Sequence, residues 1–343
     1  MKRTLFNEDH EAFREAVAEY TTRTLVPRHE QFIAQHGFDR DIWLEAGKQG
    51  LLGLEVPEEY GGGAAGDYRF NAVLGEELAK VSAAFSSCFG IHFDVCAPYL
   101  VELTTEEQKK RWLPRFCSGE MITAIGMTEP SGGSDLAALR TTAVKDGSDW
   151  IIDGSKTFIT NGYTADLVIV AARTSPEKRA KGITLFALEE GMPGFTRGRK
   201  LDKVGQPESD TAELFFEGVR VPAENVIGEI DRGFIHMMER LPQERIGSAV
   251  SNIAHAAQIL VETLQYVKDR KAFGQSVGSF QHNKFLLADL VTRVEVSSPR
   301  ECAATHLSMY ASHTSICVNS SASRNLLCWK EPIGAPKALR SRA

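Results

Sequence analysis

The sequence lacks the residue patterns of several protein classes. Its six cysteines form no Cys-x-x-Cys pair and no zinc-like spacing with its nine histidines, which argues against a disulfide framework and against a metal site. It contains no block of lysines and arginines, and its formal net charge is -6. An acidic protein is not attracted to nucleic acid or to an anionic membrane. We therefore expect no metal ion and no nucleic-acid partner.

Long hydrophobic runs are also missing. No apolar stretch approaches the roughly 20 residues that a transmembrane helix requires, so we expect no membrane span. The first residues, MKRTLFNEDHEAFREAV, are too acidic for a signal or transit peptide, which predicts a cytoplasmic protein. The composition, with 43% hydrophobic and 24% charged residues, is typical of a globular protein, and 343 residues are enough for two or three domains.

The residues that are present predict an α+β protein with three successive domains. Residues 1–120 carry apolar side chains at helical spacing and predict an N-terminal helical domain. Residues 121–230 contain short β-rich runs, among them ADLVIVAAR and TAELFFEGVRV, and predict a central β domain. Residues 231–296 return to helical spacing along one apolar stripe, which predicts a partial C-terminal helical domain.

Residues 297–343 have a different character. Nine of these residues are serine, three are cysteine, and the helical periodicity is lost. We interpret this segment as an aberrant tail, as a frameshift would produce. The apolar face of the preceding stretch, LADLVTRVEV, would then have no neighbouring helix to cover it.

Glycine-containing segments predict the turns. GGGAAG, residues 61–66, formally matches the dinucleotide-binding fingerprint, but it follows VPEEY rather than a buried strand. A turn before a helix around residues 71–81 is the better interpretation. The dipeptides DG at 146–147 and DG at 153–154 are typical of tight connections, so we expect a turn at each.

Four motifs follow one another along the chain. GMTEPSGGSD (126–135) comes after a β-rich run and can present hydroxyls and backbone N–H groups to an anionic or ring-carbonyl ligand, although it lacks the lysine of a P-loop. KTFITNG (156–162), RKAFGQ (270–275) and FQHNKF (280–285) follow. Each motif alone is compatible with an ordinary turn, helix end or surface segment. Taken together, the order and spacing of the four motifs resemble those of the acyl-CoA dehydrogenase family, and of its long-chain type in particular. The resemblance covers about residues 6–296.

The resemblance implies a fold and a reaction. In that family a helical N-terminal domain, a central β-barrel-like domain and a C-terminal four-helix bundle enclose FAD. The implied enzyme is a flavoprotein oxidoreductase of fatty acid β-oxidation, a homodimer or homotetramer that converts a fatty acyl-CoA thioester to the trans-2-enoyl-CoA. Its electrons would pass to an electron-transfer flavoprotein. A flavin acyl-CoA oxidase and a non-catalytic acyl-CoA or flavin-binding remnant remain as alternatives.

The resemblance also assigns the residues of the site. Those assigned to FAD are Ile125, Met127, Thr128, Ser134, Phe158, Ile159, Thr160, Arg270, Phe273 and Gln281. Within this set, Arg270, Phe273 and Gln281 would reach the FAD of a neighbouring subunit, the arginine as a cation suited to pyrophosphate. Ser134 and Arg245 are assigned to substrate binding.

Glu244, in LPQERIG (241–247), allows two interpretations. Pro242 is favoured at the first position of a helix, and an acid two residues later would lie in the positive first turn, worth about 0.3–1 kcal/mol. The residues alone favour this account. In the long-chain and isovaleryl types of the family, however, the catalytic base lies on this long helix. The resemblance therefore assigns Glu244 as the base that removes the proton α to the thioester.

Overall fold

The structure, a computed structural model, describes residues 5–297, so the prediction of an aberrant tail lies almost entirely outside the described residues. The N-terminal part is helical, as predicted. Its α-helices are α1 (Glu8–Tyr20), α2 (His29–Gln35), α3 (Asp41–Lys48), α4 (Arg69–Val81), α5 (Ala83–Gly90), α6 (Ala97–Glu102) and α7 (Glu106–Ser118). A π-helical segment, η4 (Ile91–Cys96), joins α5 to α6.

Local sequence explains where these helices begin. The Asn7 side chain caps α1 and the Thr105 side chain caps α7, each within a reciprocal capping box. The segment 61–66 lies before α4, as expected, but only Gly61 is in a turn and residues 62–66 are irregular. The stretch Ala83–Glu102 is apolar and long enough to cross a membrane, but 72% of it is buried inside the protein, which is typical of a core helix.

The middle part forms one sheet. Its strands are β1 (Thr123–Gly126), β2 (Thr142–Asp146), β3 (Asp149–Thr160), β4 (Leu167–Arg173), β5 (Ile183–Glu189), β6 (Phe195–Lys200), β7 (Thr211–Val221) and β8 (Val226–Ile227). Their order is β6-β7-β3-β2-β4-β5-β8, and β1 pairs in parallel with β4. Among residues 5–297 the two outer strands, β6 and β8, do not pair with each other. The α+β class is confirmed, but the barrel-like middle domain was wrong because the sheet does not close.

The two predicted Asp-Gly turns have different outcomes. Asp146-Gly147 forms the turn between β2 and β3, as expected. Asp153-Gly154 lies inside β3, at a point where the register with β7 shifts between Ile152 and Gly154. Gly154 has a φ of 146°, which residues with a side chain rarely adopt. A glycine is therefore required here by a β-bulge and not by a turn.

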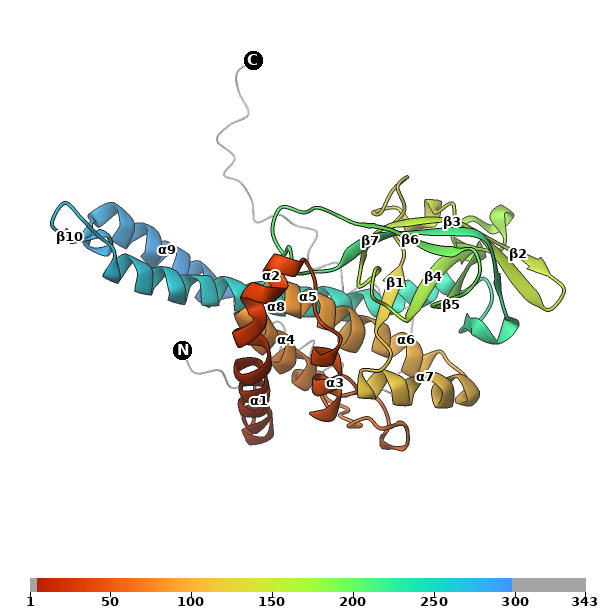
Figure 1. Ribbon diagram of the computed structural model, residues 1–343, viewed down its shortest axis with the longest axis horizontal. Helices are drawn as coiled ribbons and strands as arrows, with labels where there is room; N and C mark the ends of the chain where they lie inside the picture. The colour runs from red at the N-terminus through yellow and green to blue at the C-terminus, as the bar shows by residue number, and fades with distance from the viewer. Residues whose placement is uncertain (1–4, 298–343) are drawn as a thin grey trace, which may run out of the picture.

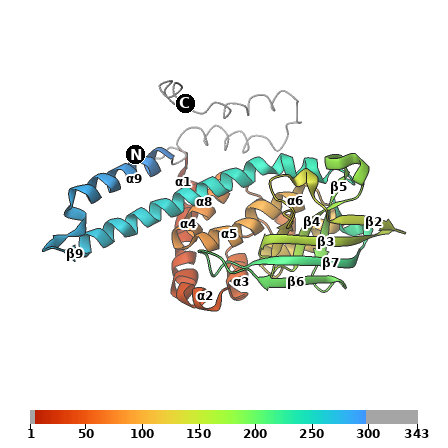
Figure 2. The same ribbon diagram turned by 90° about the horizontal axis from the view of Figure 1, so that it is seen from above.

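The C-terminal part is a long helical hairpin. The helix α8 (Gly233–Asp269) is 37 residues long and crosses the whole molecule, and α9 (Gln281–Ser297) returns beside it. Two short strands, β9 (Lys271–Ala272) and β10 (Gln275–Ser276), pair at the turn. In Figures 1 and 2 the tip of the hairpin extends away from the rest of the protein, on the side opposite the sheet.

The part of the hairpin that extends from the body exposes large apolar side chains. They are Ile259, Val261, Tyr266, Phe273, Phe285, Leu286, Leu290 and Val296. No residue of α9 is buried, whereas α8 packs against α4, α5 and η4. The expectation that the apolar face of α9 is uncovered therefore holds for the described residues.

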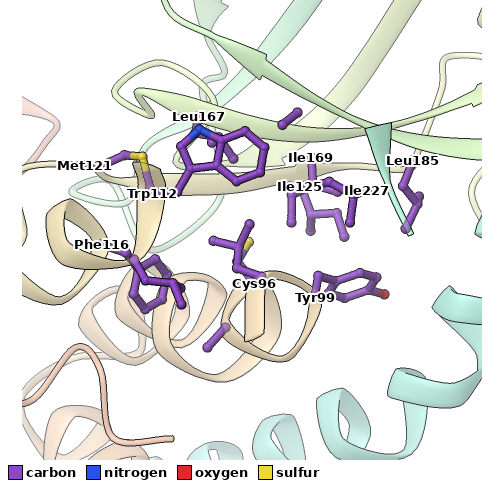
Figure 3. Packing of buried hydrophobic residues seen from close by; sticks show 14 of the residues in the cluster. Cys96, Tyr99, Trp112, Phe116, Met121, Ile125, Leu167, Ile169, Leu185 and Ile227 are labelled. Atoms are coloured by element: carbon purple, nitrogen blue, oxygen red, sulfur yellow. The ribbon is translucent and has the colours of Figure 1, made fainter. Parts of the chain in front are cut away.

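A large hydrophobic core joins the helical domain to one face of the sheet. Figure 3 shows Tyr99 and Cys96 on the helical side facing Ile125, Ile169 and Ile227 on the strands. All five side chains belong to one buried cluster. The cluster holds η4 and α6 rigidly against β1, and these are the elements from which the candidate site is built.

Candidate functional site

Glu244 lies in the interior of α8 and not at its start. The helix begins at Gly233, which is about three turns before Glu244, and it continues through Pro242. Proline removes one backbone hydrogen bond but does not end this helix. The macrodipole acts within the first turn, so it does not account for an acid at this position. The interpretation of Glu244 as a first-turn acid is therefore wrong.

The surroundings of Glu244 disfavour its charged form. Burial raises the pKa of its carboxyl group, and the charge of Asp94 acts in the same direction. Two groups oppose this rise: the Tyr99 hydroxyl donates a hydrogen bond of 3.2 Å to Oε1, and Arg240 contributes a positive charge. Arg240 lies 5.2 Å from the centre of the Tyr99 ring and pairs with Glu102 at 2.5 Å. The net pKa of Glu244 is raised, as a general base working near neutral pH requires.

A cavity connects Glu244 to one of the predicted flavin residues. It measures about 310 Å³, and its wall includes Glu244 and Gly247 of α8, Asp94 of η4 and Thr160 at the end of β3. Residues of α4 and α5 complete the wall. A partly buried carboxylate and the segment at the end of β3 thus meet in one space, although 84 residues separate Thr160 from Glu244 in the sequence.

A buried ion pair fixes the loop after β1 against β3. Lys156 Nζ lies 2.8 Å from Glu129 Oε1, and the Lys156 side chain has no solvent exposure. The Glu129 carboxylate also accepts from the backbone N–H groups of Arg140 and Thr141, at 2.6 and 2.9 Å. Burial alone would raise the pKa of Glu129, but the Lys156 charge and these hydrogen bonds outweigh it and hold the pKa at about 2. Both residues lie within the motifs quoted above, but their pairing was missed.

The residues of the sheet domain that were predicted to bind the flavin differ in their solvent exposure. Thr128 is half-buried, and its carbonyl accepts from the Thr157 N–H at 3.0 Å, while Ser134 is exposed. Phe158 is 68% exposed and has a φ of 60°, an unusual conformation for an aromatic residue. Such a conformation at an exposed aromatic side chain is typical of a ligand-facing segment.

Three other predicted positions have inward-facing side chains. Ile159 is 3% exposed and belongs to the core of the sheet, and Ile125 belongs to the cluster in Figure 3. Met127 is half-buried, and its carbonyl accepts from Lys156 Nζ at 3.2 Å. A ligand at Ile125 or Ile159 would therefore meet the backbone and not the side chain.

The other predicted positions lie apart from this group. Arg270 follows the last residue of α8, Phe273 is 95% exposed in the turn of the hairpin, and Gln281 begins α9. Figure 2 shows this turn, marked by β9, at the end of the hairpin away from the sheet. The three residues cannot contact Thr128 or Thr160 within one chain. Arg245 is exposed and is not part of the cavity wall, unlike its neighbour Glu244.

A buried polar network next to Glu244 was not predicted at all. Asn71 Nδ2 donates to Glu55 Oε1 at 2.9 Å and to Asp94 Oδ1 at 3.1 Å. Gln243 Nε2 lies 3.2 Å from the same Asp94 oxygen. Burial raises the pKa of Glu55 to about 8 and that of Asp94 to about 6. The sequence contained no signal for this network, because its members come from four separate segments and form no motif.

The class of protein follows from the architecture together with comparisons with known proteins. Three family models match in order: the acyl-CoA dehydrogenase N-terminal domain over residues 7–120, the middle domain over 124–219 and the C-terminal domain over 231–311. The long-chain specific acyl-CoA dehydrogenase of Sus scrofa mitochondria is 44% identical over 301 residues, which cover 86% of this chain and 69% of that protein.

Solved structures agree with the sequence comparison. An acyl-CoA dehydrogenase from Geobacillus kaustophilus has a TM-score of 0.83 at 44% identity and covers 86% of this chain and 78% of that chain. A chain from the electron transferring flavoprotein of Acidaminococcus fermentans has a TM-score of 0.81 at 36% identity, covering 90% and 84%. A glutaryl-CoA dehydrogenase from Mycobacterium smegmatis in complex with FADH2 has a TM-score of 0.78 at 28% identity, covering 86% and 74%.

These matches define the chain as an oxidoreductase of the flavoprotein class that acts in acyl-CoA metabolism. The chain belongs to the acyl-CoA dehydrogenase family. The prediction of the family from its motifs is confirmed.

Proposed function

We propose that the protein oxidises an acyl-CoA thioester to the trans-2-enoyl-CoA, with Glu244 as the base. The observation that carries the proposal is the shared cavity, in which the Glu244 carboxylate and Thr160 lie together. Proton removal α to a carbonyl needs one carboxylate that is shielded from water and still accessible to the substrate. Glu244 meets both conditions, because it is partly buried and lines the cavity.

Glu244 takes the α-proton, and its neighbours tune that step. The Tyr99 hydroxyl donates to one oxygen of the Glu244 carboxylate and leaves the other available to the substrate. The positive charge of Arg240, which lies over the Tyr99 ring, lowers the pKa of Glu244 and so limits the rise that burial causes. The raised pKa makes the Glu244 carboxylate a stronger base, which makes the proton transfer more favourable.

The residues at the end of β1 and β3 are suited to a flavin. Thr128 and Thr160 offer hydroxyls, the loop 126–135 offers backbone N–H groups, and the exposed Phe158 ring offers an apolar surface. These groups match the carbonyl edge and the flat face of an isoalloxazine ring. We therefore assign FAD as the cofactor, held by these residues and, through a backbone contact, by Ile125, Met127 and Ile159. When bound, FAD supplies the acceptor for the hydride that leaves the β-carbon.

Residues outside the cavity extend the proposal to partners. Arg270, Phe273 and Gln281 are exposed at the end of the hairpin, which leaves them free to reach the FAD of a second subunit in a homodimer or homotetramer. Ser134 and Arg245 are exposed and remain accessible to the CoA part of the substrate. The similarity to a chain of an electron transferring flavoprotein structure supports an electron-transfer flavoprotein as the acceptor of the electrons.

Anaerobic mixing of the flavin-loaded protein with saturated acyl-CoA thioesters tests the proposal. Bleaching of the flavin absorbance and formation of the enoyl-CoA are expected. A protein purified without flavin, and unable to take it up, would instead support a non-catalytic remnant. Rapid oxygen consumption during turnover would support an acyl-CoA oxidase.

A further inference from the structure

The wall of the cavity next to Glu244 combines apolar surface with polar side chains. Ten of its 19 wall residues carry polar side chains, and three more are glycines. Sites for apolar ligands are lined mainly by hydrophobic and aromatic side chains, with few polar groups. Several of these side chains pair with each other, as Ser86 does with Ser251, but a purely aliphatic acyl chain would offer nothing to a wall acceptor that has no partner.

Asp94 is the most deeply placed acid of the wall. It is 6% exposed and lies on η4, where α8 approaches it closely. A Cβ atom added to Gly247 would come within 2.1 Å of Asp94 Oδ2, so the close approach depends on a glycine at this position. Gly247 lies three residues after Glu244, about one helical turn along α8. Asp94 on η4 therefore contacts the side of α8 that carries Gly247 and Glu244, and the two acids line the same cavity.

The network around Asp94 leaves acceptor capacity unused. Its Oδ1 accepts from Asn71 and Gln243, and its Oδ2 accepts from the Tyr68 hydroxyl at 3.1 Å. A carboxylate has about four acceptor sites, so one is left on Oδ2. Asn71 Oδ1, on a side chain that is 2% exposed, has no hydrogen-bond partner among the described residues.

The side-chain amide of Asn71 has a fixed orientation, so the atom without a partner is its carbonyl oxygen and not its nitrogen. Its Nδ2 donates to Asp94, whose pKa is about 6, so at neutral pH a rotation of the amide would place its oxygen against an ionised carboxylate. The carbonyl oxygen therefore points away from that carboxylate, on a residue that lines the cavity. A buried acceptor without a partner carries an uncompensated desolvation penalty, which a ligand with a donor group removes.

We propose that the acyl-binding end of this cavity selects acyl-CoA thioesters whose chain carries a hydrogen-bond donor, a hydroxyl or an ammonium group, which binds Asn71 Oδ1 and Asp94 Oδ2. This inference rests on the proposed function for the location of the thioester, and it deepens that function by naming the class of the acyl group. Gln243 and Glu55 act as positioning residues, since they hold Asp94 and Asn71 in place.

Binding of matched thioesters to the flavin-loaded full chain tests the selection. The series would compare ω-hydroxyacyl-CoA, ω-aminoacyl-CoA and unsubstituted acyl-CoA of equal chain length, over several lengths. Calorimetric Kd values provide a readout that does not depend on turnover, and kcat/KM provides a second. At the length that brings the donor to Asp94, we expect a donor-bearing thioester to bind about 10-fold or more tightly than its alkyl counterpart.

Asp94→Asn is the informative variant, because it keeps the shape of the side chain and removes its charge. It should reduce the preference for the donor-bearing thioester severalfold, while Asp9→Asn, the same change on the exposed first turn of α1, should leave the preference unchanged. Equal binding of alkyl and donor-bearing thioesters at all lengths, or a preference that survives in Asp94→Asn with an unchanged melting temperature, would overturn the inference. If no thioester bleaches the flavin, the proposed function fails instead, and the Kd values still decide the selection.

Discussion

At the scale of single residues, the site depends on how buried charges are compensated. Glu244 is stabilised by a neutral donor, Tyr99, and its pKa is raised, whereas Glu129 is stabilised by a cation, Lys156, and its pKa is held at about 2. The raised pKa makes the first carboxyl group the stronger base of the two. The second remains ionised and fixes the loop after β1.

Tyr99→Phe should shift the pH dependence of flavin reduction. The base acts when it is deprotonated, so the rate should rise with pH through the pKa of Glu244. The Tyr99 hydrogen bond lowers that pKa, and its removal should raise the midpoint. The phenyl ring keeps the contact with Arg240. Single-turnover bleaching from pH 5 to 9 measures the midpoint, and an unchanged or lower midpoint would contradict the role given to Tyr99.

Lys156→Met should destabilise the protein strongly. It leaves the Glu129 carboxylate buried without its cation, which costs about 3–5 kcal/mol in comparable buried pairs. The double variant with Glu129→Gln should recover part of the loss. Urea unfolding at neutral pH measures both free energies of unfolding, and a single variant within about 1 kcal/mol of the parent would show that the pair is not structural.

The same pair predicts the behaviour in acid. The folded-state pKa of Glu129 is lowered, so its stabilisation is complete above the unfolded value of about 4.5 and is lost as the pH falls toward about 2. Glu129→Gln should therefore make the free energy of unfolding less dependent on pH in this window. An identical pH dependence in parent and variant would be the contrary result.

At the scale of secondary structure elements, patterns with a strong period were predicted well and special backbone positions were not. The β-rich runs around β4 and β7 and the helical stripe of α8 could be predicted because burial imposes their periods on the sequence. The return of helical spacing at residue 231 agrees with the start of α8 at Gly233, whereas the alternative interpretation of a helix start at Pro242 was wrong because this proline is tolerated inside the helix.

The site was predictable to the extent that it lies in motifs. Glu244 and Thr160 were found through their local sequences, and the structure brings them to one cavity. Asp94, Asn71 and Glu55 could not be found, because hydrogen bonds between separate segments leave no spacing in the sequence. The sheet strands β6 and β8 are short and were also not anticipated.

Gly154→Ala tests the bulge in β3. The added methyl group would lie 2.7 Å from Thr141 Oγ1 at a φ of 146°, and Thr141 itself hydrogen-bonds Glu129. We expect a loss of about 1–3 kcal/mol in the free energy of unfolding. Gly66→Ala is a matched control, because its added methyl group meets no atom within 4 Å and its φ is not in the left-handed region. Equal stability of the two variants would argue against a constrained bulge.

At the scale of the whole molecule, the long hairpin is the feature that a single chain does not explain. The part that extends from the body exposes apolar side chains on α8 and α9, together with the predicted flavin-binding Arg270. Exposed apolar surface of this kind is typical of a protein interface. The account therefore predicts that this part of the hairpin contacts a second subunit.

Arg270→Ala should release FAD and weaken the oligomer together. The arginine is proposed to bind the pyrophosphate of the FAD in the neighbouring subunit, so the cofactor and the interface depend on each other. Sedimentation velocity and the flavin-to-protein absorbance ratio measure the two effects. Lys268→Ala removes an exposed cation two residues earlier and should change neither. Unchanged flavin occupancy in Arg270→Ala would contradict the proposal that Arg270 binds the FAD of the neighbouring subunit.

The central claim is that Glu244 removes the α-proton, and single-turnover bleaching of the flavin by a saturated acyl-CoA under anaerobic conditions tests it most directly. Glu244→Gln keeps the shape of the side chain and its bond to Tyr99 but cannot accept the proton, while Glu262→Gln makes the same change on the exposed side of α8. The account predicts that Glu244→Gln keeps its flavin and its acyl-CoA affinity and bleaches about 10²- to 10⁴-fold more slowly, with Glu262→Gln as fast as the parent. A near-normal bleaching rate in Glu244→Gln would contradict the account and assign the base to another residue.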